Sequence, residues 1–231
     1  MINDLPAYVP VTFFATTAFA LYLFFLASRK NKLLILVVAM WLLFQAVIAL
    51  TGFYHYEKGF PPRFALAVLP PLVSVIMLFL LPKGRAFVDT FDLRQLTFLQ
   101  TFRFPVELVL YWLYVASYIP SVMTFDGRNW DIITGITAPV IGFMYFYRGT
   151  AGRGTLTAWN IMGLILLANI VSHAVLSAPT DFQRLAFDMP NTGVFYFPYI
   201  WLPSFLVPLA LLSHLISLRQ LSGRSDQSSQ M

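Results

Sequence analysis

Polar side chains recur at helical spacing within one long apolar stretch of the chain, residues 103–131. The series is an acid, three phenols and a hydroxyl: Glu107, Tyr111, Tyr114, Tyr118 and Ser121. Their spacing of i, i+4, i+7, i+11 and i+14 would place them on one face of a helix. Such a stripe faces lipid only at high cost, and a carboxyl group inside an apolar run is a candidate for proton coupling or cation binding. The stretch therefore predicts a polar path that faces other protein or a water-filled cavity.

Glu107 has a second interpretation, which is purely structural. Pro105 suits the first position of a helix, so Glu107 would lie in the first turn near the inner surface. The helix dipole favours an acid there, and Arg103 is one turn away and could pair with it. The functional and the structural interpretation of Glu107 both stay open.

A second group of polar residues flanks later apolar runs. Asn169 and His173 are spaced i, i+4, and polar segments on the same predicted side supply Asn129, Asp131 and Asp188. A lone histidine inside a membrane can equally serve as a hydrogen-bonded contact between helices. We expect these groups to form a vestibule on the external face. The predicted ligand-binding residues combine this vestibule with the polar stripe: Glu107, Tyr111, Tyr114, Tyr118, Asn129, Asp131, Asn169, His173 and Asp188.

Several kinds of chemistry are excluded by what the chain lacks. Without cysteine there are no disulfides, thiol nucleophiles or thiolate metal sites. His173 and His214 would differ in depth by on the order of 20 Å at ~1.5 Å per helical residue, too far to bracket one haem iron. No lysine follows Lys83, so no late helix can carry a retinal Schiff base, and the HExxH, GxSxG and phosphate-loop motifs are absent. We expect no cofactor and no bound metal.

Composition places the elements that carry these residues in a membrane. Of the 231 residues, 58% are hydrophobic and 11% are charged, whereas soluble domains carry about 25% charged residues. The basic residues lie at the ends of apolar runs and not on one exposed face, which argues against a nucleic-acid partner. The chain is predicted to be an all-α integral membrane protein.

Seven apolar runs indicate a bundle of seven transmembrane helices, since a helical span takes ~20 residues. The runs are 8–28, 33–54, 64–82, 104–125, 132–148, 157–177 and 195–218. Together they predict one domain, 1–221, followed by a disordered cytoplasmic tail at 222–231. Residues 83–103 have Phe87, Phe91, Phe98 and Phe102 on one helical face. They predict a short amphipathic helix before the fourth span, either lying on the inner leaflet or extending that span into the cytoplasm. A plain connector packed under the bundle is the alternative.

Charge distribution predicts the orientation, because positive residues concentrate in cytoplasmic loops. With the N-terminus outside and the C-terminus inside, most of the 15 basic residues are cytoplasmic. The cytoplasmic basic residues are Arg29, Lys30, Lys32, Lys83, Arg85, Arg94, Arg103, Arg148, Arg153, Arg219 and Arg224. The external segments contain the remaining four, Lys58, Arg63, Arg128 and Arg184. Most of the acidic residues, including Glu57, are also external. We therefore expect a multi-pass protein of the cell's inner membrane.

Three patches carry a resemblance to a family: FRFPVELVLYWL, GRNWDIITGITAP and FPYIWLPSFLVPLALLSHL. The chain resembles an uncharacterised family of small seven-span bacterial membrane proteins. No activity, cofactor or site residue follows from that resemblance.

Three functional hypotheses follow from these features. The first is a small carrier or binding protein for an unidentified small molecule or lipid, with a polar site between spans four, five and six that opens to the external face. The second is a membrane enzyme acting on a lipid headgroup at the outer leaflet, with Asp131, Asp188 or His173 as acid or base. The third is a non-catalytic subunit of a membrane complex. The expected partners are the lipid bilayer, a small-molecule or lipid ligand, and a second copy or a partner subunit.

Overall fold

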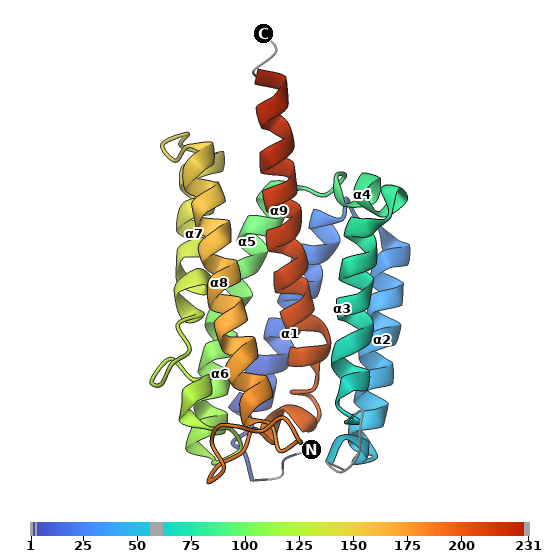
Figure 1. The fold of residues 1–231 in the computed structure, drawn as a ribbon, viewed down its shortest axis with the longest axis vertical. Coiled ribbons are helices and arrows are strands. Elements are labelled where there is room, and N and C mark those ends of the chain that lie inside the picture. The colour runs from blue at the N-terminus through green and yellow to red at the C-terminus, as the bar shows by residue number, and fades with distance from the viewer. Residues whose placement is uncertain (1, 3, 56–61, 229–231) are drawn as a thin grey trace.

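The structure is a computed structural model that describes residues 2, 4–55 and 62–228, and every regular element in those residues is a helix (Figure 1). The prediction of an all-α chain is confirmed for that part. Within it, 4 helices are long and apolar enough to cross a membrane: Tyr8–Ala27 (α1), Lys32–Leu50 (α2), Arg153–Ser177 (α8) and the segment Leu202–Gly223. The bent pair Ala65–Leu80 (α3) and Pro82–Val88 (α4) would make a fifth span. These helices are compatible with a membrane protein.

Polar residues at the helix ends fix where several of these elements begin. Asn31 precedes α2 and its side chain accepts a hydrogen bond from the backbone N–H of Leu34 at 3.0 Å. Asp92 does the same for Leu93–Leu99 (α5), where it accepts from Arg94 and Gln95. Such caps satisfy N–H groups that have no partner inside the helix.

The polar connector at 83–103 differs from its prediction as one amphipathic helix. It forms α4 and then α5, and α5 continues through the 3₁₀ turn Gln100–Phe102 (η2) into Arg103–Val115 (α6). Leu96, Leu99 and Phe102 are buried in the core of the bundle. Asp92, which is partly exposed, starts the new helix. The helical run that contains Glu107 therefore occupies 93–115 and not 104–125.

Residues 116–131 lie beside α6 instead of extending it. The helix ends because Ser117 adopts a left-handed φ of 63°, and the N–H groups of Ser117 and Tyr118 bond back to the carbonyls of Tyr114 and Leu113, a Schellman ending. The segment then passes through Ser121–Met123 (η3) to Asp131, which precedes Ile132–Phe146 (α7). Because Asp131 contacts Arg103 at the opposite end of α6, the segment returns along a helix ~20 Å long.

The start of α7 packs very closely against the start of α6. A Cβ added at Gly135 would lie 2.4 Å from the backbone nitrogen of Phe104, a distance that no larger residue allows without a shift of backbone. This close approach holds Asp131 next to Arg103.

Leu202–Leu206 forms a π-helical turn (η5) that leads into Val207–Ser228 (α9). Pro208 has no N–H to donate to the carbonyl of Ser204. That carbonyl accepts instead from the indole N–H of Trp41 at 2.9 Å. The turn is therefore stabilised from a neighbouring helix, and it places Pro203 and Leu206 toward a cavity described below.

Two predictions fall partly on residues that the structure does not describe. Glu57 and Lys58 lie outside the described residues, as do 229–231 of the expected tail. Helix α9 extends to Ser228, into the stretch 222–231 that the sequence predicted as a disordered tail.

Candidate functional site

An ion pair between Arg103 and Asp131 lies inside the bundle, near the middle of the helical run 93–115. The side chains are 2% and 8% exposed, and Arg103 Nε and Asp131 Oδ2 are 3.2 Å apart without the alignment of a hydrogen bond. Both residues were expected at opposite surfaces, Arg103 inside and Asp131 outside. They meet because α5 carries the chain inward before Arg103 and the 116–131 segment returns to it.

Glu107, one turn along α6 from Arg103, is joined to the returning segment. Its Oε1 accepts a hydrogen bond from Asn129 Nδ2 at 2.6 Å, and the same amide group donates to the carbonyl of Met123 at 3.1 Å. The side-chain oxygen of Asn129 accepts from the backbone N–H of Asp131. The side chain of Asn129 therefore both holds the irregular segment in place and orients the carboxyl group of Glu107.

The guanidinium of Arg103 also reaches α8 and α9. Its Nη1 lies 3.4 Å from the carbonyl oxygen of Gly163 and 3.4 Å from Nε2 of His214. His214 Nδ1 is 2.8 Å from Asn160 Oδ1, and Asn160 Nδ2 donates to the carbonyl of Leu156. With these partners, His214 is a neutral imidazole that donates from Nδ1 and accepts at Nε2.

Gly163 is required for this arrangement. A Cβ at that position would lie 2.4 Å from Cε1 of the His214 ring. The absence of a side chain lets the imidazole lie flat against α8 and reach Asn160.

Several buried polar atoms of the site have no hydrogen-bond partner in the described part of the chain. They are Arg103 Nη2, Glu107 Oε2, Asp131 Oδ1 and Thr134 Oγ1, together with Asn191 Oδ1 in the segment between α8 and α9. Buried polar groups are normally paired. All of these residues except Thr134 line a cavity, where a bound polar group could pair with the free atoms.

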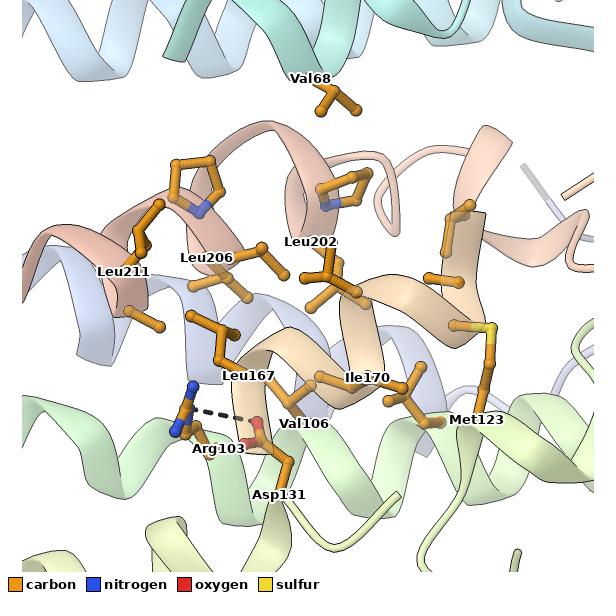
Figure 2. Close-up of a pocket in the computed structure, with 18 of the residues that line it drawn as sticks. Val68, Arg103, Val106, Met123, Asp131, Leu167, Ile170, Leu202, Leu206 and Leu211 are labelled. Carbon is orange, nitrogen blue, oxygen red and sulfur yellow. Dashed lines mark ion pairs between the residues drawn. The ribbon is translucent and has the colours of Figure 1, made fainter. Parts of the chain in front are cut away.

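The cavity itself has a volume of about 260 Å³. Figure 2 shows Arg103 and Asp131 at one end, on the side remote from Val68 of α3, and apolar side chains around the remainder. Glu107 and Asn191 also line it. The labelled apolar walls are Val68, Val106, Met123, Leu167, Ile170, Leu202, Leu206 and Leu211. Ligand sites commonly combine such apolar walls with a few convergent polar groups.

The residues predicted for ligand binding separate into two groups. Glu107, Asn129 and Asp131 come together, although Asn129 and Asp131 are buried and not part of an exposed vestibule. Asn169 donates to the carbonyl of Arg128, His173 Nδ1 is 2.9 Å from the carbonyl of Asn169, and Asp188 is exposed. None of these last three lines the cavity.

The three tyrosines are likewise outside the cavity lining. Tyr111 stacks on Phe125 with ring centroids 5.1 Å apart, and Tyr114 packs against the core. Tyr118 lies beyond the end of α6, where it meets Tyr196 edge to face. The predicted stripe therefore stops at Tyr114, because the Schellman ending rotates the chain away from the helical register.

The sequence offered Arg103 as a partner for Glu107 near the inner surface, whereas the structure pairs Arg103 with Asp131 inside the bundle. The sequence did not reveal Asn160 and His214 as members of the site. One signal for Arg103 was present: buried apolar residues recur at three- or four-residue steps on both sides of it, at Leu96, Leu99, Phe102, Val106, Leu110 and Leu113. That spacing carries one buried face across residue 103. Among the described residues, no three of His, Cys, Asp and Glu gather as a metal site.

Comparison with family models gives one match, to a domain of unknown function (DUF8737), over residues 61–222. The match covers more than half of the chain, and the protein therefore belongs to that family. The matched residues include all the polar residues of the site described above, from Arg103 to His214. No curated protein and no solved structure matches the chain.

Proposed function

We propose that this chain is a polytopic membrane protein that binds an amphiphilic small molecule or lipid in the cavity beside Arg103, Glu107 and Asp131. The observation that carries the proposal is the cavity itself, whose apolar walls end at buried polar atoms that have no hydrogen-bond partner in the described part of the chain. An apolar body would fill the walls, and a polar head would pair with the atoms at the end. Carriage of the bound molecule across the membrane is the natural extension of such a site.

The surroundings of the cavity favour access from lipid. Val175 of α8 lines the cavity and is 46% exposed, and Ala168 on the same helix is exposed as well. Ile161 and Ile165, also exposed on α8, make the adjoining surface apolar. We propose that an amphiphile enters laterally at this face of α8.

The proposed topology has seven passes with the N-terminus outside. Two passes are composite: α5, η2 and α6 form one, and the 116–131 segment with α7 forms the next. Irregular backbone at membrane depth is tolerated only where protein or water surrounds it, which suits a segment held by Asn129. The connections rich in Arg and Lys lie at the C-terminal end of the bundle (Figure 1), and moving Arg103 into the interior leaves that asymmetry in place.

Cysteine labelling tests the topology without background, because the native chain has no cysteine. Lys30→Cys and Asp181→Cys introduce thiols at two exposed positions, the second in the connection between α8 and α9. In intact cells, an impermeant maleimide should label Asp181→Cys only, and Lys30→Cys should react only after the membrane is opened. The reverse pattern would overturn the orientation.

Filling the cavity tests the binding function. Val171→Trp places a large ring at a residue that lines the cavity, and Val140→Trp is the matched control, 54% exposed on α7 and outside the lining. The protein purified in nanodiscs should retain amphiphiles that native mass spectrometry detects. The occupancy should fall at least tenfold in Val171→Trp and stay unchanged in Val140→Trp. Equal occupancy in both variants would contradict the proposal.

A further inference from the structure

One carboxylate oxygen in the cavity has neither a hydrogen-bond partner nor an ion-pair partner among the described residues. Glu107 is 1% exposed, its Oε1 is engaged by Asn129, and its Oε2 has no hydrogen-bond partner among the described residues. No Lys, Arg or His of the described chain lies within ion-pair distance of it. An ionised carboxylate held away from water without a partner is costly.

Arg103 cannot neutralise both acids of the site. Its guanidinium faces Asp131, while Nη1 is directed to the carbonyl of Gly163 and to His214. His214 has the partners of a neutral imidazole and adds no charge. The described cavity lining thus holds two carboxyl groups, Glu107 and Asp131, against one guanidinium. With both acids ionised, the site lacks one positive charge.

We propose that the molecule bound in this cavity is an amphiphile with a single positive charge at its polar end, an aliphatic amine or a molecule with an equivalent head, and that Glu107 Oε2 receives that charge. This inference rests on the proposed function of amphiphile binding. A cationic head next to Glu107 balances the site, and Asp131 Oδ1, which has no hydrogen-bond partner among the described residues, can accept a further N–H donor. A carboxylate or phosphate head would add a second unbalanced negative charge.

The size of the cavity indicates how much of the molecule is enclosed. At about 30 Å³ for a water-sized group, a volume of about 260 Å³ holds on the order of nine heavy atoms. A longer tail would leave the cavity at the exposed face of α8. A nine-carbon chain is therefore a suitable probe length.

A head-group series tests the inference on the native protein. Nonylamine, nonanol and nonanoate share one tail and differ in charge. In nanodiscs, each is titrated against radiolabelled nonylamine at pH 7 in a scintillation proximity assay. Nonylamine should bind at least tenfold more tightly than nonanol, and nonanoate should compete least. A preference for nonanoate would show that Arg103 receives the ligand, and equal binding of amine and alcohol would remove the role of charge; either result would overturn the proposal.

Two variants locate the charge preference. Glu107→Gln should reduce the affinity for nonylamine at least tenfold and leave nonanol unchanged. Asp126→Asn, which removes an exposed acid of the 116–131 segment, is the matched control and should keep the amine preference. An unchanged preference in folded Glu107→Gln would also overturn the assignment. If the native protein saturates with none of the three probes, the binding function itself fails, which is a result distinct from a wrong head group.

Discussion

Two Arg–Asp ion pairs in this molecule differ in how completely each is satisfied. Arg219 of α9 forms two parallel hydrogen bonds to Asp89, both 2.8 Å long, and the side chains are 37% and 43% exposed. Arg103 approaches Asp131 at 3.2 Å without hydrogen-bond alignment, and both are buried. In the exposed pair, both carboxylate oxygens of Asp89 accept hydrogen bonds from Arg219. In the buried pair, Arg103 Nε, Arg103 Nη2 and Asp131 Oδ1 have no hydrogen-bond partner among the described residues, and both side chains line a cavity.

The difference indicates that the two pairs serve different purposes. An exposed pair contributes only ~0–1 kcal/mol, even when its geometry is good. A buried pair costs several kcal/mol per ion in lost hydration, which is recovered only with excellent geometry and additional hydrogen bonds. The arrangement at Arg103 lacks that completeness. It therefore does not maximise stability, as the proposed binding of a ligand would allow, and the following substitutions test this contrast.

The largest effect is expected from breaking the buried pair. Arg103→Met removes the guanidinium and leaves Asp131 and Glu107 buried without a positive partner. We expect a loss of ~3–5 kcal/mol in the free energy of unfolding, measured by SDS titration in mixed micelles. Arg219→Met is the matched control at the exposed pair. Equal losses in the two variants would contradict the contrast drawn here.

A smaller loss is expected from separating the helices that hold the buried pair together. Gly135→Ala directs a Cβ into the backbone at Phe104, so α7 must shift and carry Asp131 away from Arg103. Overpacking of this kind costs ~1–3 kcal/mol. Gly154→Ala is the control, because a Cβ there meets nothing within 4 Å. The same SDS titration should separate the two, and an unaffected Gly135→Ala would show that the contact at α6 adapts.

Asn129 connects the 116–131 segment to Glu107, and its removal should loosen that segment locally. Asn129→Ala removes the bonds to Glu107, to the Met123 carbonyl and to the N–H of Asp131. We expect a loss on the order of 1–2 kcal/mol. Hydrogen exchange should become faster at residues 123–131 and stay unchanged in α2. Unchanged protection at 123–131 would mean that packing alone orders the segment.

The smallest effect is expected at the exposed pair. Asp89→Asn removes its charge while Gln220 still donates to the carbonyls of Val88 and Phe91 nearby. The loss should be at most ~1 kcal/mol, and it should shrink in 1 M salt, where the Debye length is about 3 Å. A loss as large as that of Arg103→Met would reverse the comparison.

The sequence alone determined the helical class and the apolar runs, because both depend on local composition and on periodicity. It also identified Glu107, since an acid within an apolar run is visible without any partner. The caps at Asn31 and Asp92 are local interactions too, because each bonds to N–H groups two or three residues ahead, but the helix start at Asp92 was not predicted. These features need no knowledge of which segments meet.

Only the tertiary structure decided how the charges pair. Asp131 follows Arg103 by 28 positions, and their contact requires both the inward course of α5 and the return of 116–131. His214 and Asn160 join the same cluster from α9 and α8. Hydropathy averages over a window and cannot distinguish a charge at the end of a span from one inside it. The interior place of Arg103 was decided by packing, because buried residues on both sides of it continue one face of a single helical run.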